Sequence, residues 1–163
     1  MDEAEKMTGP FAKGDLLIAA VALADPNFHQ TIVLLCEHEE EHGSYGLILN
    51  RAIETPDEVL SEVPFVDGRL FQGGPVHSDV IQVLHPYGET LEGSQLVLPV
   101  VWFGANFEAL QSGIMSGVYA PAACRFFLGY SGWGEGQLAD EFDADAWLVA
   151  PGNHTLVFET GPE

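Results

Sequence analysis

Residues 31–51 read TIVLLCEHEEEHGSYGLILNR, and this stretch decides the fold class. Residues 31–36 are apolar and partly β-branched, which is typical of a buried strand. Residues 45–49 form a second apolar run, and the polar segment EHEEEHGS separates the two. Two strands joined by a short polar connection predict a β-hairpin, in which the strands pair antiparallel.

More strands are predicted on both sides of this hairpin. Short apolar runs between turn residues occur at 16–21, 69–72, 80–85, 95–101, 124–130, 147–149 and 155–158. Patterns with helical spacing or a helix N-cap are fewer and occur at 56–62, 103–114 and 137–142. Because strands dominate and come in adjacent pairs, we expect an α+β fold with a mixed or antiparallel sheet flanked by helices.

Length and composition indicate one folded domain. The chain has 163 residues, of which 47% are hydrophobic, so it can bury a substantial core. Residues 1–13 are polar and predict a flexible tail, with a single domain over 14–163. The acidic N-terminus does not resemble a signal peptide and no apolar stretch approaches the length of a membrane span, so we expect a cytoplasmic protein.

The charge balance argues against polyanionic partners. Five Lys and Arg residues stand against 25 Asp and Glu, which gives a net charge of −20. Nucleic acids and anionic membrane surfaces are bound largely through Lys and Arg, so direct contact with either is not expected. We interpret the acidity as a means of keeping the protein soluble, with a cationic partner as the alternative.

Cys36 and His38 are the candidate catalytic residues. Residues two apart on a strand share a face, so a thiolate–imidazole pair is one interpretation and a buried structural cysteine is the other. A metal-assisted hydrolase using His38 and His85 is a further, weaker alternative. We expect no metal, no cofactor and no disulfide between Cys36 and Cys124.

The candidate binding residues lie in three segments. Asn50 and Arg51 end the second hairpin strand, and arginine suits planar contact with carboxylate or phosphate. The glycine turn at 73–75 and the glycine-rich run at 129–138 permit close backbone approach to a ligand. The residues selected in these two segments are Gly73, Gly74, Pro75, Tyr130, Trp133, Gly136 and Gln137. Ser131 is not expected to be a nucleophile, because the residue two positions later is tryptophan and not glycine.

Taken in order, these segments resemble the bacterial YqgE/AlgH family over about residues 14–158. The segments are LLIA at 16–19, DPNF at 25–28, VLLCEH at 33–38, GLILNR at 46–51, GGPV at 73–76, LH at 84–85 and GYSGWGEGQL at 129–138. The resemblance implies one α+β domain with a branched sheet flanked by helices. It implies no established biochemical activity, although some members carry the label of transcriptional regulator. Family members usually continue into a closing helix, which is expected to be missing here.

The sequence thus favours a non-enzymatic binding or regulatory module that does not contact DNA directly. We expect its ligand to be a protein or a small molecule. The alternative is a thiol-dependent enzyme or redox sensor that uses Cys36 with His38.

Overall fold

The computed structural model describes residues 12–20, 30–39, 43–54, 56–57, 70–144 and 146–159. The strands within these residues are β1 (Asp15–Ala19), β2 (Ile32–Glu39), β3 (Gly43–Ile48), β4 (Leu70–Gln72), β5 (Val76–His85), β6 (Gln95–Leu98), β7 (Val101–Phe103), β8 (Arg125–Trp133) and β9 (Trp147–Pro151). Within the same residues, the α-helices are α3 (Phe107–Met115), α4 (Gln137–Asp143) and α5 (His154–Glu159), with two 3₁₀ turns, η2 (Gly88–Thr90) and η3 (Pro121–Ala123).

The predicted hairpin is confirmed as β2 and β3. The two strands pair antiparallel, with Leu34 opposite Leu47. The register then shifts between Leu35 and Glu37, which is a β-bulge with one extra residue on β2. Beyond the bulge Glu37 lies opposite Tyr45, so the alternation of side chains on β2 is reversed over its last residues.

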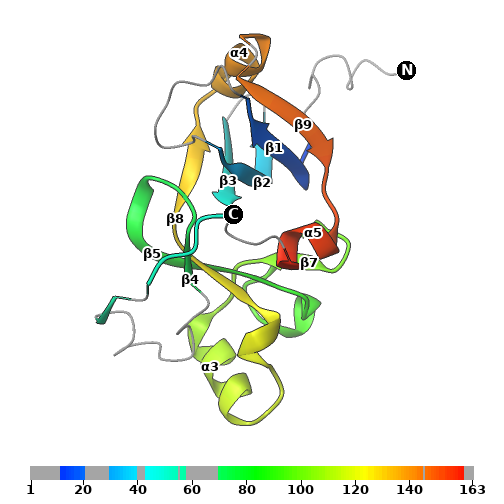
Figure 1. Ribbon diagram of the computed structural model, residues 1–163. Coiled ribbons are helices and arrows are strands. Elements are labelled where there is room, and N and C mark those ends of the chain that lie inside the picture. The colour runs from blue at the N-terminus through cyan, green and yellow to red at the C-terminus, as the bar shows by residue number, and fades with distance from the viewer. Residues whose placement is uncertain are drawn as a thin grey trace.

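β8 is the strand around which the sheet is organised. It runs from the α3 end of the molecule to the α4 end (Figure 1). The path of paired strands is β6-β7-β5-β8-β3-β2-β1-β9, and β4 joins β8 outside this path, in parallel. The protein is thus a single domain built mostly from one curled, largely antiparallel sheet with a parallel branch, and the helices among the described residues are short.

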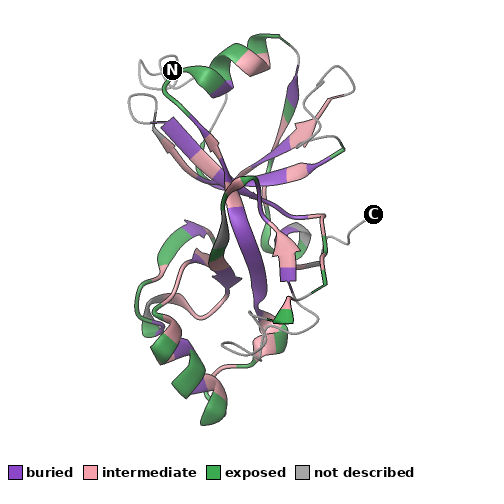
Figure 2. Cartoon of the chain, turned by 90° about the vertical axis from the view of Figure 1, so that its left-hand side faces the viewer, coloured by how far each residue is buried: buried purple, intermediate pink, exposed green. Residues whose placement is uncertain are grey.

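The described core residues form three clusters. Two lie on the two faces of the sheet, and the third lies at the end of the sheet near α3. Leu34, Cys36 and Leu47 belong to the first, Trp133 and Trp147 belong to the second, and the third lies between β5, β8 and α3. The strands that cross the middle of the molecule are largely buried, whereas α4 and α3 at its two ends present exposed faces (Figure 2).

The expected single strand at 95–101 is two strands. β6 and β7 form a hairpin that turns at Pro99–Val100, where Val100 adopts a φ of 69°. Phe103 belongs to β7, so the helix expected from 103 begins instead at Phe107. Asn106 marks the start of α3, because its side-chain Oδ1 accepts a hydrogen bond from the Ala109 N–H and caps the helix.

The strand expected at 155–158 is wrong, because this segment is the helix α5. An apolar run of four residues fits either period, and tertiary contacts decide between them. Val157 is fully buried in the first core cluster, and its carbonyl accepts a hydrogen bond from the Arg125 guanidinium at 2.8 Å. The helix predicted at 56–62 falls mostly outside the described residues, as does the start of the strand predicted at 69–72.

Candidate functional site

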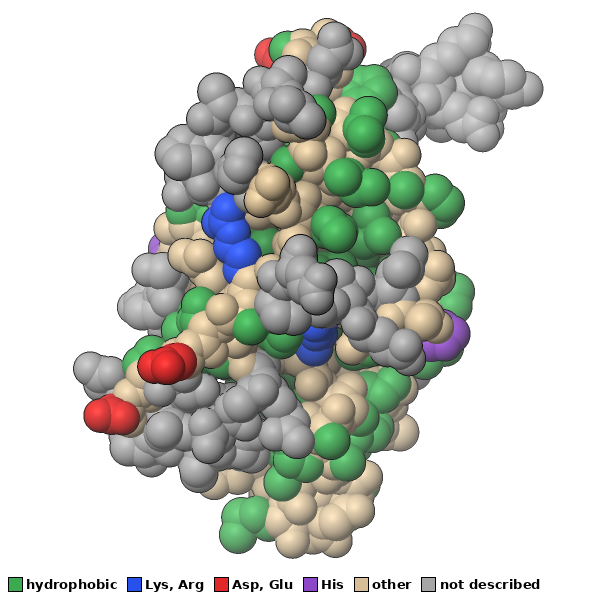
Figure 3. All heavy atoms as spheres, viewed as in Figure 1, with side chains coloured by type: hydrophobic (Ala, Val, Ile, Leu, Met, Phe, Trp, Pro, Cys, Tyr) green, Lys and Arg blue, Asp and Glu red, His purple; other side chains and the backbone are tan. Residues whose placement is uncertain are grey.

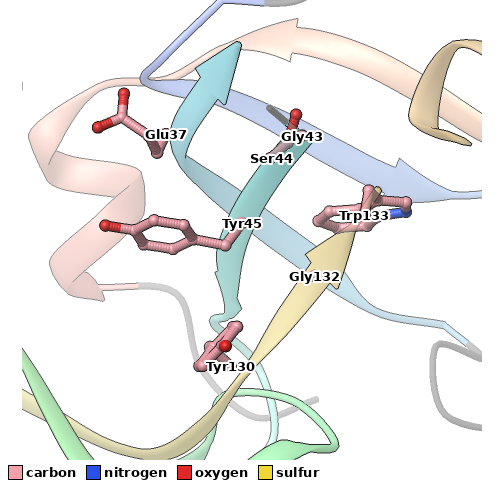
Figure 4. A pocket seen from close by; sticks show the side chains of 7 residues that line it. All are labelled: Glu37, Gly43, Ser44, Tyr45, Tyr130, Gly132 and Trp133. Carbon is pink, nitrogen blue, oxygen red and sulfur yellow. The ribbon is translucent and has the colours of Figure 1, made fainter. Parts of the chain in front are cut away.

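A hollow lies where β3 meets β8. The two strands pair with Tyr45 opposite Gly132 and Ser44 opposite Trp133. Because Gly132 has no side chain, the sheet face beside the Tyr45 ring is left open. The resulting hollow has a volume of about 370 Å³ and is lined by Glu37, Gly43, Ser44, Tyr45, Tyr130, Gly132 and Trp133 (Figure 4).

A second hollow of about 240 Å³ adjoins the first and shares two tyrosines with it. Its lining residues are Tyr45, Gln82, Phe103 and Tyr130. The rings form a continuous aromatic row: the Tyr45 centroid lies 5.6 Å from Phe103 and 5.8 Å from Tyr130, the latter in an edge-to-face arrangement. His77 continues the row, with its ring 5.8 Å from Tyr130. Tyr45 and Tyr130 therefore form the wall between two adjacent hollows.

The bulge in β2 places a carboxylate beside these tyrosines. It places Glu37 opposite Tyr45, and both line the larger hollow. Burial raises the pKa of Tyr45 to about 12, and the neighbouring Cys36, Glu37 and Tyr130 add to the effect. The phenol is therefore neutral at physiological pH and can donate a hydrogen bond. Within the described part of the chain, no residue pairs with the Glu37 carboxylate or hydrogen-bonds the Tyr45 hydroxyl.

The bulge also separates the predicted pair Cys36 and His38. Cys36 packs in the first core cluster at 2% exposure, and burial raises the pKa of its thiol well above the ordinary value. The His38 ring lies on the opposite face, where its Nδ1 is 2.6 Å from the Ser44 Oγ. Since the thiolate is the reactive species of cysteine, this geometry does not support thiol chemistry. Cys124 is also buried, and its Sγ lies 3.7 Å from the Ala120 carbonyl oxygen.

Trp133, predicted as a binding residue, is a core residue that is only 4% exposed and contributes an edge to the hollow. Its indole N–H donates to Glu141 Oε1 at 3.0 Å, and the Trp147 indole N–H donates to the same oxygen at 2.9 Å. Gln137 donates to the other carboxylate oxygen and accepts from the Gly134 N–H. We call the set Trp133, Gln137, Glu141 and Trp147 the indole–carboxylate cluster. Gly136, with a φ of 74°, starts α4 beside it.

The glycine turn at 73–75 also has a structural explanation. A Cβ atom on Gly73 would contact the Gly129 carbonyl, and one on Gly74 would contact the Tyr130 backbone. The Gly73 carbonyl accepts hydrogen bonds from the Ile48 N–H and the Ser131 hydroxyl. These glycines let the chain pass from β4 to β5 against β8, while Pro75 is exposed.

Asn50 and Arg51 lie at the base of the β2–β3 hairpin, away from the residues that line the two hollows. The Asn50 side chain accepts from the Ile32 N–H and donates to the Gln30 carbonyl, each at 3.0 Å. The Arg51 carbonyl accepts from the Gln72 N–H. Asn50 therefore fixes the start of β2. Of the residues predicted to bind, Tyr130 and Trp133 line the larger hollow, and the others do not.

The buried His85 is close to a hydroxyl, but its tautomer excludes base catalysis there. Its Nδ1 accepts from the Tyr87 N–H at 3.1 Å, so the neutral ring carries its proton on Nε2. Nε2 lies 3.0 Å from the Gly104 carbonyl and 2.9 Å from Ser94 Oγ. Because the Gly104 carbonyl can only accept, Nε2 is a donor and cannot take a proton from Ser94.

We expect His85 to take up its proton at a lower pH than an ordinary histidine, whose pKa is 6.5. Burial lowers the pKa of this imidazole, so the unfolded chain binds the proton at a higher pH than the folded protein. The contribution of His85 to stability is therefore present above about pH 6.5 and is lost as the pH falls further. Long-range ¹H–¹⁵N spectra should show the neutral Nε2–H tautomer as the main form at pH 6.5. An imidazolium at pH 6.5 or above would contradict this assignment.

Two other classes of site are absent from the described part of the chain. It contains no group of three or more His, Cys, Asp or Glu side chains placed to hold a metal ion. None of its helices is long and apolar enough to span a membrane. On the face shown in Figure 3, the Lys and Arg side chains form separate spots without a continuous basic stripe.

Sequence reasoning missed Glu37, Tyr45 and Gly132 as site residues. The bulge that places Glu37 opposite Tyr45 was not expected, because the strand was predicted at 31–36 and residues 37–44 were predicted as a polar connection. Gly132 lies within the glycine-rich run that the sequence marked as unusual, and its pairing with Tyr45 across the sheet depends on tertiary structure.

This fold, a single mostly antiparallel sheet centred on one long strand, matches known proteins. The family model described as AlgH-like matches residues 16–163. A UPF0301 protein from Chlorobaculum parvum is 42% identical over 146 residues, which are 89% of this chain and 78% of the relative. One from Chlorobium chlorochromatii is 40% identical over 164 residues, covering 100% of this chain and 85% of the relative. The chain belongs to the AlgH-like family, as its sequence resemblance indicates.

Solved structures agree with this assignment. The solution structure of the AlgH protein from Pseudomonas aeruginosa superposes with a TM-score of 0.71 at 32% identity, covering 90% of this chain and 80% of that one. A crystal structure of a Corynebacterium diphtheriae protein gives a TM-score of 0.75 at 23% identity over 93% of this chain and 81% of that one, which is evidence for the fold alone.

Proposed function

We propose that this protein is a non-enzymatic binding module whose ligand occupies the hollow between Glu37, Tyr45 and Tyr130. The observation that carries the proposal is the pair of half-buried tyrosines that form the wall between two adjoining hollows. Ligand sites are typically concave, lined by aromatic rings and supplied with a few polar groups. The larger hollow, at about 370 Å³, lies within the size range of small-ligand pockets.

The chemistry of the described residues supports binding more than catalysis. A nucleophile needs an accessible position and a base within hydrogen-bond reach. The Ser44 hydroxyl lies 2.6 Å from His38 Nδ1, but Ser44 is buried, with 9% of the residue exposed. Cys36 and His38 lie on opposite faces of β2, and His85 presents a donor to Ser94. Direct nucleic-acid binding is not part of the proposal, because the net charge is −20 and five Lys and Arg residues supply little attraction for phosphate.

Gly132→Ala provides a selective test of this site. A Cβ atom at Gly132 would lie 3.6 Å from the Tyr130 ring and 3.9 Å from Val76, which are ordinary contacts. The methyl group should therefore fill part of the hollow and change the free energy of unfolding by less than about 1 kcal/mol. Fragment binding can be monitored by ¹H–¹⁵N spectra. The binding site should map to the hollow in the wild type, and the affinity should fall roughly tenfold or more in the variant.

The matched control is Gly117→Ala, at a glycine outside the hollow where an added Cβ atom would have no atom within 4 Å. Its φ of 84° strains an alanine, so this variant should lose about 1 kcal/mol of stability. It should nevertheless bind the same fragments with wild-type affinity. Fragments that bind elsewhere on the surface, or that bind Gly132→Ala as tightly as the wild type, would contradict the proposed site.

A further inference from the structure

We propose that the hollow selects an organic cation, an ammonium or guanidinium group held between the Tyr45 and Tyr130 rings and the Glu37 carboxylate. This inference rests on the proposed function and goes beyond it by naming the chemical class of the ligand. It follows from three features of the hollow: the arrangement of its rings, the position of its only described carboxylate and the lack of a lining cation among the described residues.

Two aromatic rings border the hollow side by side. Tyr45 and Tyr130 meet edge to face, with an interplanar angle of 61° and centroids 5.8 Å apart. Both rings border the larger hollow, and Figure 4 shows them on adjacent strands with Gly132 leaving the space beside them. A cation within about 6 Å of such a ring is attracted by the negative face of its π system. A group seated in the hollow can approach both rings together.

Glu37 supplies the charge that distinguishes a cation from a neutral ligand. It lies opposite Tyr45 across the β2–β3 pair and lines the same hollow. Burial is the main cause of the raised pKa of Tyr45, and the Glu37 carboxylate adds to it, so its field reaches the phenol. No residue in the described part of the chain pairs with this carboxylate, so an incoming N–H group would meet an uncommitted acceptor.

The remaining lining residues disfavour an anionic ligand. The residues around the larger hollow are tyrosines, a tryptophan, a serine, glycines and Glu37, with no Lys or Arg among those described. The whole chain carries a net charge of −20, which attracts cations over a distance and repels anions. A carboxylate or phosphate ligand would therefore lack a counter-charge and would face Glu37 directly.

The test uses the full chain and four defined probes. Butylammonium and butylguanidinium chloride carry the cation, 1-pentanol is the neutral comparison, and Nα-acetyl-lysine N-methylamide presents the ammonium as a polypeptide would. Affinities come from ¹H–¹⁵N and tyrosine-ring ¹H–¹³C titrations at low salt. We expect the cations to bind at least several-fold more tightly than pentanol. Their affinity should fall as salt is added.

Glu37→Gln keeps the size of the side chain and removes its charge. We expect it to weaken the binding of the cations by roughly three- to tenfold and to leave the affinity for pentanol unchanged. Glu108→Gln is the matched control: it makes the same change in net charge on the exposed start of α3, outside the lining of both hollows, and should leave every affinity unchanged. A lysine derivative that binds more tightly than butylammonium would support the inference and identify a polypeptide side chain as the source of the cation.

Two outcomes would overturn the inference, and they are distinguishable. If pentanol binds the hollow as tightly as the cations and Glu37→Gln changes nothing, the cation specificity is wrong while the binding site stands. If neither these probes nor the fragment library shifts the resonances of Tyr45 and Tyr130, both the cation specificity and the proposed function are wrong.

Discussion

Replacing Trp147 with alanine should lower the free energy of unfolding by about 3–5 kcal/mol, as for other large-to-small core substitutions. Trp147 is only 1% exposed and packs in the second core cluster between β1, β2 and α4. Its ring meets Trp133 edge to face at 5.9 Å, and its indole N–H donates to Glu141. The substitution therefore opens a cavity and also removes one of the donors to a partly buried carboxylate.

Urea unfolding followed by circular dichroism measures this effect. Trp102→Ala is the control, because Trp102 is on β7 outside the indole–carboxylate cluster and is partly exposed, so its loss should cost less. Trp147→Phe should fall between the wild type and Trp147→Ala, since it keeps an aromatic ring and loses only the N–H donor and part of the volume. A Trp147→Ala protein no less stable than Trp102→Ala would contradict the assigned packing.

Gly74→Ala should destabilise the protein by about 3 kcal/mol, at the upper end of the range for overpacked sites. Its new Cβ atom would overlap the backbone of Tyr130 and Ser131 in β8, and backbone atoms cannot rotate away as a flexible side chain can. The link between β4 and β5 would have to move off β8. That movement would weaken the hydrogen bonds that the adjacent Gly73 makes with Leu128 and Ile48.

The control for this substitution is Gly132→Ala, on the central strand β8 against which Gly74 packs. There the added methyl group meets only ordinary contacts, so the loss of stability should stay below about 1 kcal/mol. The two variants together separate a glycine required by close backbone approach from one that leaves a hollow open. Equal denaturation midpoints for Gly74→Ala and Gly132→Ala would be inconsistent with the packing of β4 and β5 on β8.

Local sequence patterns predicted the elements that local interactions determine. The β2–β3 hairpin, the strand at β9 and the helix at α4 lie where their apolar runs and turn residues place them. The errors occur where a contact distant in sequence decides the outcome. β8 extends past Tyr130 to Trp133 because β3 pairs with its last residues, and 154–159 is helical while Val157 packs into the core.

The candidate site was predicted less well, for two physical reasons. A single β-bulge reverses the faces of Glu37 and His38, and this reversal separates the expected Cys36–His38 pair and creates the Glu37–Tyr45 pair. Trp133 was selected as a binding residue because it offers an apolar ring with a polar N–H group in a glycine-rich segment. Its indole is instead fixed by Glu141, and the side chain is buried. Tyr130 is the predicted residue that combines partial exposure with a position on both hollows.

The central claim is that the Tyr45–Tyr130 wall is the binding surface, and the four tyrosines of the chain allow a direct test. Tyr87 and Tyr119 are 4.6 Å apart at the α3 end and serve as internal references. The decisive measurement is the ¹H–¹³C spectrum of the tyrosine rings with and without the ligands found in the fragment screen. The account predicts that the Tyr45 and Tyr130 signals shift and those of Tyr87 and Tyr119 do not. Shifts confined to Tyr87 and Tyr119 would contradict it.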